Sequence, residues 1–252
     1  MRLTLLHRPY TNLLTAWLLF YLPNITLAQS ISLLTDEWCP YTCELNSDKP
    51  GILVEVANKV FSQDDIDIDY QMVNWARAIK KVRVGKGDAL LGAYKSDSPD
   101  FIFHTSPILY SQMCFFVQAN DPWLYTGLNS LLERQLSVVN GYSYGELFDQ
   151  YMLQHPKNFI LLTGDELLNR ASFMLYKKRI DTILEDKYVF HEEQLAGHLK
   201  VAGCLAKEGV YIAFSPAHKA RSQALVILID AKLVELKAQG EIEKIIAKYY
   251  EP

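Results

Sequence analysis

The sequence predicts an α/β protein of two lobes, each a mostly parallel sheet flanked by helices, with two segments crossing between the lobes. Two observations predict this class. Short apolar runs alternate with amphipathic stretches through most of the chain, a pattern typical of β-α-β units with parallel strands. The order helix, turn, buried strand also occurs twice, at residues 75–93 and at residues 167–186. Two such units indicate two similar lobes, with a binding site between their strand ends.

Residues 1–28 have the features of a secretory signal peptide. Their start is basic, residues 13–22 form an apolar run too short to cross a bilayer, and Thr26-Leu27-Ala28 ends in small residues. We therefore expect cleavage after Ala28, a periplasmic location and no stable membrane insertion of the mature protein. An uncleaved anchor is the alternative interpretation.

The first lobe is expected to begin with three strands and two helices. Residues 51–61 have helical spacing of apolar side chains, whereas residues 66–72 alternate apolar and polar side chains like a strand. The helix that begins at Trp75 should end at the Gly85-Lys86-Gly87 turn, since glycine accepts the positive φ of a helix C-terminus. In order, the predicted elements are a strand at 31–35, a helix at 51–61, a strand at 66–72, a helix from 75, and a strand at 89–93.

Residues 108–118 form a long, mostly apolar segment that we interpret as one strand crossing into the second lobe. The second lobe then has predicted helices at 128–132, 147–153 and 166–178, and predicted strands at 136–140, 159–162 and 180–184. A strand at 210–215 should return to the first lobe, where helices at 221–238 and 241–249 pack. Lobe one is thus predicted to comprise residues 29–110 and 214–252, and lobe two residues 111–213, with a hinge at the two crossings.

Charge and cysteine content narrow the functional classes. The formal net charge of −4 offers no basic stripe to neutralise phosphates, which argues against nucleic-acid binding. Four cysteines in an exported chain favour disulfides. Cys39 and Cys43 could close a tight loop; Cys114 and Cys204 would then pair by elimination or stay as buried thiols. A zinc site at the first pair lacks a second ligand pair nearby.

The chain resembles the bacterial extracellular solute-binding proteins of family 3, two-lobed periplasmic proteins that mostly serve amino-acid uptake. The motifs that carry the resemblance are Trp38-Cys39-Pro40-Tyr41 with Gly51, the block WARAIKKVRVGKGDALLG, Ser106-Pro107 with Tyr110, Gly141-Tyr142-Ser143, Arg179-Ile180-Asp181 with Asp186, and the ending Leu236, Gly240, Ile245 and Lys248-Tyr249. The resemblance implies a type II periplasmic-binding-protein clamshell that is monomeric, closes over a small polar solute and serves an inner-membrane ABC permease. It implies no cofactor, no metal and no catalytic residue.

The resemblance also implies which residues contact the solute. Aromatic residues cover it from lobe one, a glycine-led turn donates hydrogen bonds to it from lobe two, and an acidic residue at a lobe-two strand end, matched by Asp186, accepts its ammonium group. The candidate ligand-binding residues are Trp38, Tyr41, Trp75, Arg77, Ala93, Tyr94, Gly141, Tyr142, Ser143 and Asp186.

One family feature is missing. Amino-acid binders of this family carry an arginine after the third strand, a planar donor fork that clamps the α-carboxylate. Here that loop, residues 95–100, reads KSDSPD and contains no arginine. Arg77 or Lys95 is the candidate replacement, and a solvated surface arginine is the alternative for Arg77. Two further functions stay open: a sensory or partner-presenting domain with another ligand, and an enzyme derived from a binding protein, such as a small dehydratase.

Overall fold

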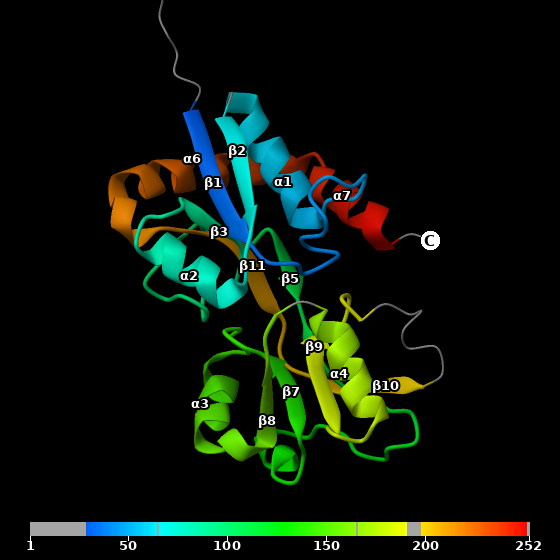
Figure 1. The fold of residues 1–252 in the computed structure, drawn as a ribbon. Helices are drawn as coiled ribbons and strands as arrows, with labels where there is room; N and C mark the ends of the chain where they lie inside the picture. The colour runs from blue at the N-terminus through cyan, green and yellow to red at the C-terminus, as the bar shows by residue number, and fades with distance from the viewer. Residues whose placement is uncertain (1–28, 65, 165, 191–197, 251–252) are drawn as a thin grey trace, which may run out of the picture.

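Two sheets organise the chain, one in each lobe, and two strands run between them (Figure 1). The computed structural model describes residues 29–64, 66–164, 166–190 and 198–250. The expected signal peptide, residues 1–28, lies outside the described residues. The predicted α/β class is confirmed, because each sheet contains three parallel strands and is flanked by helices.

The first sheet has the strand order β2-β1-β3-β11-β4, with β5 paired to β11. Its strands are β1 (Gln29–Thr35), β2 (Ile66–Met72), β3 (Ala89–Ala93), β4 (Ile102–Phe103), β5 (Leu109–Ser111) and β11 (Glu208–Phe214). β1, β2 and β3 are parallel, whereas β11 runs antiparallel to β3, β4 and β5.

Helices cover both faces of this sheet. They are α1 (Ile52–Phe61) and α2 (Trp75–Arg83), followed near the C-terminus by α6 (Lys219–Ala238) and α7 (Glu241–Tyr250). Leu33 belongs to the apolar cluster of α1, α6 and α7, whereas its neighbour Leu34 belongs to the cluster of α2. Successive strand residues point to opposite faces, so a strand buried on both sides must be apolar throughout. This explains the unbroken apolar run in β3.

The second sheet has the order β10-β6-β9-β7-β8. Its strands are β6 (Met113–Gln118), β7 (Leu136–Val139), β8 (Phe159–Leu162), β9 (Thr182–Asp186) and β10 (Leu199–Cys204), and its helices are α3 (Glu146–Gln154) and α4 (Leu167–Tyr176). β7, β8 and β9 are parallel, and β6 and β10 close the other edge in antiparallel fashion. Phe115 packs with Phe148 of α3, whereas Phe116 packs in the cluster of α4.

Residues 108–118 do cross between the lobes, but the prediction that they form one continuous strand is wrong. They form two strands, β5 in the first sheet and β6 in the second, separated at Gln112. The Gln112 N–H donates to the Asp186 carboxylate at 2.9 Å instead of to a neighbouring strand. The chain returns through β11, and β5 and β11 pair from Ser111↔Glu208 to Leu109↔Val210, so the two crossings lie side by side. The lobe boundaries at 110/111 and 213/214 stay a prediction.

Other differences from the predicted elements are small. The sequence did not predict β4 or β10, and the helix expected at 128–132 is a 3₁₀ turn, Leu128–Leu131. Both expected disulfides form: Cys39–Cys43, four residues apart, and Cys114–Cys204, ninety residues apart. Within the described ranges, none of the helices has the length and apolar character needed to cross a membrane.

Candidate functional site

The loop after β1 brings the first group of candidate residues to the gap between the lobes. The Cys39–Cys43 disulfide closes it, and the Trp38 N–H donates to the Thr42 carbonyl at 2.8 Å. The Thr42 hydroxyl in turn donates to the Asp36 carbonyl at 2.8 Å. These bonds make the loop a stiff hairpin-like turn that fixes the direction of Trp38.

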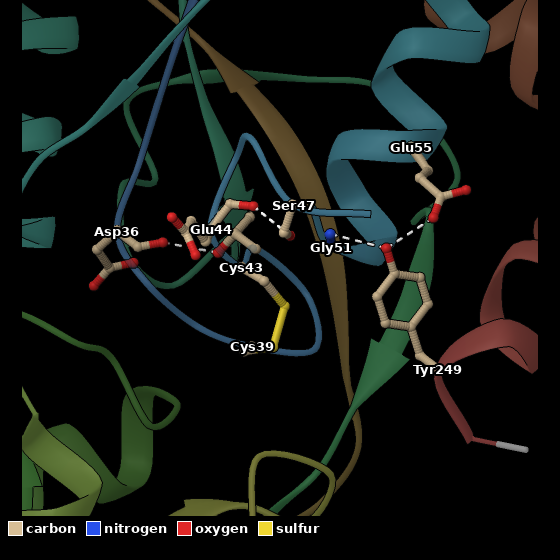
Figure 2. Close-up of a disulfide and its surroundings, with 9 residues drawn as sticks. Asp36, Cys39, Cys43, Glu44, Ser47, Gly51, Glu55 and Tyr249 are labelled. Atoms are coloured by element: carbon tan, nitrogen blue, oxygen red, sulfur yellow. Dashed lines mark hydrogen bonds between the residues drawn. A yellow bond between two sulfur atoms is a disulfide. The ribbon is translucent and has the colours of Figure 1, made fainter. Parts of the chain in front are cut away.

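The same loop is fastened to α1 and α7. The Gly51 N–H donates to the Tyr249 hydroxyl at 2.9 Å, and that hydroxyl donates to Glu55 at 2.8 Å (Figure 2). Gly51 has φ +120°, and a Cβ there would lie 2.5 Å from the Tyr41 carbonyl oxygen. Only glycine allows the loop to approach the start of α1 so closely. The C-terminal helix therefore supports a loop at the opposite end of the sequence.

Aromatic rings form the lobe-one wall. Trp38 packs on Tyr41 with ring centroids 4.1 Å apart and meets Tyr94 edge-on at 6.0 Å. Trp38 is only 7% exposed. Its ring lies over Gly92, where a Cβ would be 3.8 Å from the indole and 3.1 Å from Leu53. The end of β3 is thus shaped to receive a tryptophan face.

The turn after β7 forms part of the lobe-two wall. The Ser143 hydroxyl donates to Asp149 at 2.5 Å, and the Tyr144 N–H donates to the same carboxylate at 2.8 Å. The Tyr144 hydroxyl accepts the Val139 N–H at 2.8 Å. Asp149 lies in the first turn of α3, where negative charge is favourable. These contacts hold the turn in one conformation and leave Tyr142 pointing towards lobe one.

Two carboxyl groups end β9. The Asp186 side chain accepts the Gln112 N–H at 2.9 Å and the Tyr188 N–H at 2.8 Å. It also accepts the hydroxyl of Tyr41 from the other lobe at 3.1 Å. The neighbouring Glu185 side chain accepts the Asp186 N–H at 2.8 Å. Asp186 therefore joins β9, the crossing at Gln112 and the lobe-one loop.

Two more hydrogen bonds cross between the lobes. The Tyr142 hydroxyl donates to Asp36 at 2.9 Å, and the Ser143 N–H donates to Asp97 at 3.0 Å. The rings of Trp75 and Tyr142 meet edge-on at 6.3 Å. The strand ends of the two lobes thus face each other and are in direct contact.

The space between these walls is small. It measures about 10 Å³, room for roughly one water molecule. Its lining combines aromatic rings with acidic side chains: Asp36, Trp38, Trp75, Leu91, Gly92, Tyr94, Asp97 and Tyr142. A solute of several heavy atoms therefore needs the cross-lobe contacts to separate and the lobes to move apart.

Burial shifts the ionisation of the carboxyl groups in this gap. It raises the pKa of Asp36 and of Asp97 to about 7 and the pKa of Glu185 to about 8. Burial also raises the pKa of Asp186, against the opposing effect of its backbone donors. The site thus holds carboxyl groups that are partly protonated near neutral pH, a pattern that often marks functional sites.

The structure brings most of the predicted site residues together. Trp38, Trp75, Tyr94 and Tyr142 line the space, and Tyr41, Ser143 and Asp186 make the cross-lobe bonds described above. Gly141 lies at the edge of the gap, where a Cβ would be 2.8 Å from the Cβ of Ala76. Their roles as ligand contacts stay predictions.

Three other predicted residues lie elsewhere. Arg77 is exposed, because it projects from the solvent face of α2 beside the buried Trp75. Ala93 is a buried sheet residue paired with Tyr211. Lys95 is also exposed and stacks over the Tyr211 ring at 4.9 Å. Neither cation contributes to the lining of the gap.

The candidate list missed three acidic residues: Asp36, Asp97 and Glu185. Asp97 carried one local signal, since it follows Tyr94 by three residues and accepts that residue's N–H at 2.8 Å, as turn aspartates often do. Glu185 had only its position next to Asp186. The sequence does not show that these groups meet across the lobes.

A second hollow, of about 420 Å³, lies beside the crossing strand β5. Its lining is mostly apolar, with Lys237 and Glu243 as its charged groups: Tyr41, Ile52, Pro107, Ile108, Leu109, Tyr110, Tyr188, Lys237, Ile242, Glu243 and Ile246. Although it is the larger space, it lacks the convergence of strand ends, aromatic rings and carboxyl groups from both lobes. We therefore take the gap between the strand ends as the candidate site.

Comparison with known proteins identifies the family to which this fold corresponds. Residues 31–252 match the family model of the bacterial extracellular solute-binding proteins, family 3. No curated protein sequence matches the chain.

Several solved structures are similar. An arginine transport-system periplasmic binding protein from Legionella pneumophila is 16% identical, with 88% of this chain and all (100%) of that chain covered and a TM-score of 0.67. An ABC uptake transporter substrate-binding protein from Streptococcus pneumoniae with bound histidine is 17% identical, with 88% and 93% covered and a TM-score of 0.71. A histidine kinase sensor domain is also 17% identical, with 88% and 96% covered and a TM-score of 0.71. At these identities the likeness shows the fold alone.

Proposed function

The chain belongs to the bacterial extracellular solute-binding proteins of family 3, and from that premise we propose that it captures a small polar, amino-acid-like solute between its lobes for ABC-type transport. The observation that carries the proposal is the meeting of the strand ends of both lobes, with hydrogen bonds from Tyr142 and Ser143 to Asp36 and Asp97 across the gap. A solute that touches both lobes selects the closed arrangement.

In this proposal each wall has its own task. Trp38 and Trp75 cover the solute from lobe one, and Asp186 with the turn at Tyr142 and Ser143 holds its polar ends from lobe two. The mature protein starts at Gln29 in the periplasm, and an inner-membrane permease recognises the closed form. Solved binding proteins of transport systems share this fold, which supports a capture of the solute followed by recognition of the closed form by a permease.

A solute screen tests the proposal. The exported protein, purified and refolded to remove any solute carried over, is heated in the presence of amino acids, amines and small organic acids. A solute at 100 times its Kd stabilises the folded state by about 2.7 kcal/mol. That gain corresponds to a rise in Tm of about 5–10 °C for a chain of this size. If no solute of any class raises Tm or gives a calorimetric signal, solute capture is wrong.

A sensory function is the second candidate, because a histidine kinase sensor domain has the same fold. A sensor also binds a solute, so the two functions differ in the partner of the closed form. Cross-linking in membranes, with and without the solute, separates them: transport predicts a permease as the solute-dependent partner, and sensing predicts a receptor. Family and fold relatives are binding proteins, so an enzyme such as a dehydratase has no specific observation in its favour.

A further inference from the structure

We infer that the solute is a small organic cation that carries no carboxylate, such as an aliphatic amine or diamine. This inference rests on the proposed function, since it names the chemical class that the same site takes. Three features of the gap carry it: the sign of its charges, the occupation of its hydrogen-bond donors, and the state of one buried indole.

The charged side chains that line the gap are the carboxyl groups of Asp36 and Asp97, both from lobe one. Glu185 and Asp186 of lobe two are buried at the end of β9 without lining the gap. The main influences on the pKa values of these four groups are burial, hydrogen bonds and other carboxyl groups, Glu37 and Asp149 among them. No lysine or arginine of the described ranges is among those influences. A ligand carboxylate entering this gap would meet like charge at Asp36 and Asp97, whereas an ammonium group would meet opposite charge.

Three cations of the segments around the gap do not line it. Lys95 stacks over Tyr211, and Lys187 stacks over Tyr188 at 4.5 Å. Arg77 is exposed on α2. Recognition of an α-carboxylate normally uses a charged donor such as a bidentate arginine, and none of these three lines the gap.

The backbone donors at the turn before α3 replace such an arginine poorly. The Tyr144 N–H donates to Asp149 of the same lobe, a bond that lobe opening leaves in place. The Ser143 N–H donates to Asp97 across the gap and is released when the lobes move apart, but an entering carboxylate then meets the like charge of Asp97. The carboxyl oxygens of the site can accept further hydrogen bonds, and N–H groups on the ligand can donate them.

The indole of Trp38 supplies an independent observation. Its Nε1–H is buried and has no hydrogen-bond partner of normal geometry. The group nonetheless lies close enough to Glu185 to favour the ionised form of that carboxyl. A bound cation would also favour the ionised form of Glu185, so the indole and the cation act on this carboxyl in the same direction.

The aromatic rings complete the match. The Trp38 ring centroid lies 4.1 Å from that of Tyr41 and 6.0 Å from that of Tyr94. The rings of Trp75 and Tyr142 line the same gap. Ring faces beside carboxylates attract organic ammonium groups and accept their methylene chains. Within the described ranges, no three His, Cys, Asp or Glu side chains are arranged to hold a metal ion, so the arrangement favours an organic cation over a metal cation.

Matched pairs of compounds test the inference. Calorimetry at pH 7.5 compares putrescine with ornithine, cadaverine with lysine, and agmatine with arginine; each pair differs by one carboxylate. We expect at least one amine to bind at least tenfold more tightly than its amino acid. Equal or tighter binding of the amino acid in every pair that binds would overturn the inference and leave the proposed function intact, as would binding of only neutral or acidic solutes in the wider screen. Failure of every solute would overturn both.

Substitutions locate the effect in the gap. Glu185→Gln and Asp97→Asn should each weaken amine binding at least tenfold, whereas Asp48→Asn, at an exposed position of the lobe-one loop, should leave it unchanged. Glu185→Gln keeps the oxygen that accepts the Asp186 N–H and removes the desolvation cost of a charge, so it should fold with an unchanged or higher Tm. Asp97→Asn turns one of two accepting oxygens towards a backbone N–H as a donor, so it should fold with a lower Tm. Folded variants that bind the amine as tightly as the unchanged protein would overturn the inference.

Discussion

The two lobes share one plan but stabilise it by different means. In lobe one the disulfide closes a short loop at the gap, between Cys39 and Cys43. In lobe two the bond between Cys114 and Cys204 joins β6 to β10, with 90 residues between its cysteines. The first bond can do little more than shape the site, whereas the second restrains most of a lobe. The same covalent chemistry thus serves the site in one lobe and the fold in the other.

The carboxyl groups show a second difference. In lobe two, Asp186 accepts N–H groups from Gln112 and Tyr188 of its own lobe. In lobe one, Asp36 receives a hydrogen bond from the Tyr142 hydroxyl, across the gap. Closure thus adds the Tyr41 bond to an Asp186 side chain that its own lobe already holds, whereas the Tyr142–Asp36 bond exists only while the lobes are in contact.

Loss of the long-range disulfide should have the largest effect on stability. Cross-linking a loop of 90 residues contributes about 4–5 kcal/mol in the chain-entropy account. For a chain of this size, Cys114→Ser with Cys204→Ser should lower Tm by about 10–15 °C. Differential scanning fluorimetry measures the change. A Tm drop smaller than that of the lobe-one double variant would contradict the comparison.

Removal of the Asp186 side chain should come next. Asp186→Ala removes the hydrogen bonds that its carboxylate accepts from Gln112 N–H, Tyr188 N–H and the Tyr41 hydroxyl, at about 1 kcal/mol for each bond. We expect Tm to fall by about 5–10 °C, together with loss of solute binding. Asp48→Ala, at an exposed position of the lobe-one loop, is the control, and a Tm equal to that of the control would refute the bracing role of Asp186.

Loss of the short disulfide should affect stability less. A loop of about five residues contributes about 2 kcal/mol by the same account, so Cys39→Ser with Cys43→Ser should lower Tm by about 4–8 °C. Solute affinity should fall by at least tenfold, because Trp38 and Tyr41 lose their fixed loop. Calorimetry on the two double variants side by side checks this. Greater loss of affinity in the lobe-two variant would reverse the assignment of roles.

The sequence predicts those features that depend on local pattern. The strands at β1, β2 and β3 follow from alternation or from short apolar runs. The close spacing of Cys39 and Cys43 predicts their disulfide, whereas the sequence left Cys114 and Cys204 open between a disulfide and buried thiols. The break at Gln112 was not predictable, because nothing local marks it and its cause is Asp186, 74 residues away in sequence. β10 was missed because its short apolar stretch has no clear alternation.

Some residues of the candidate site are likewise marked by local motifs, and others by tertiary contacts alone. Trp38, Trp75 and Asp186 were found because motifs mark them, whereas Asp97 and Glu185 gain their meaning only from the opposite wall. Asp97 meets Ser143 over a separation of 46 residues. Arg77 shows the reverse error: the buried Trp75 and the exposed Arg77 are only two residues apart on α2. Charge that gathers from two lobes is a property of the tertiary structure, and no single stretch of sequence carries it.

The carboxyl groups of the gap should also make stability depend on pH, with a smaller effect than the substitutions above. Their folded pKa values, about 7 for Asp36 and Asp97 and about 8 for Glu185, lie above the unfolded values, so the folded state holds protons that the unfolded state has lost. Stability must then fall as pH rises through 7 and 8. The buried His104 has a pKa lowered to about 4, so below pH 6.5 it makes stability rise with pH and opposes the effect of the carboxyl groups. Between pH 6.5 and 8.5 the carboxyl groups can therefore be observed without this opposing effect. Over that interval we expect Tm to fall by several degrees, and Glu185→Gln should reduce the fall while Asp48→Asn leaves it unchanged. A Tm that stays level or rises over this interval would show that these carboxyl groups are already ionised when the lobes are in contact.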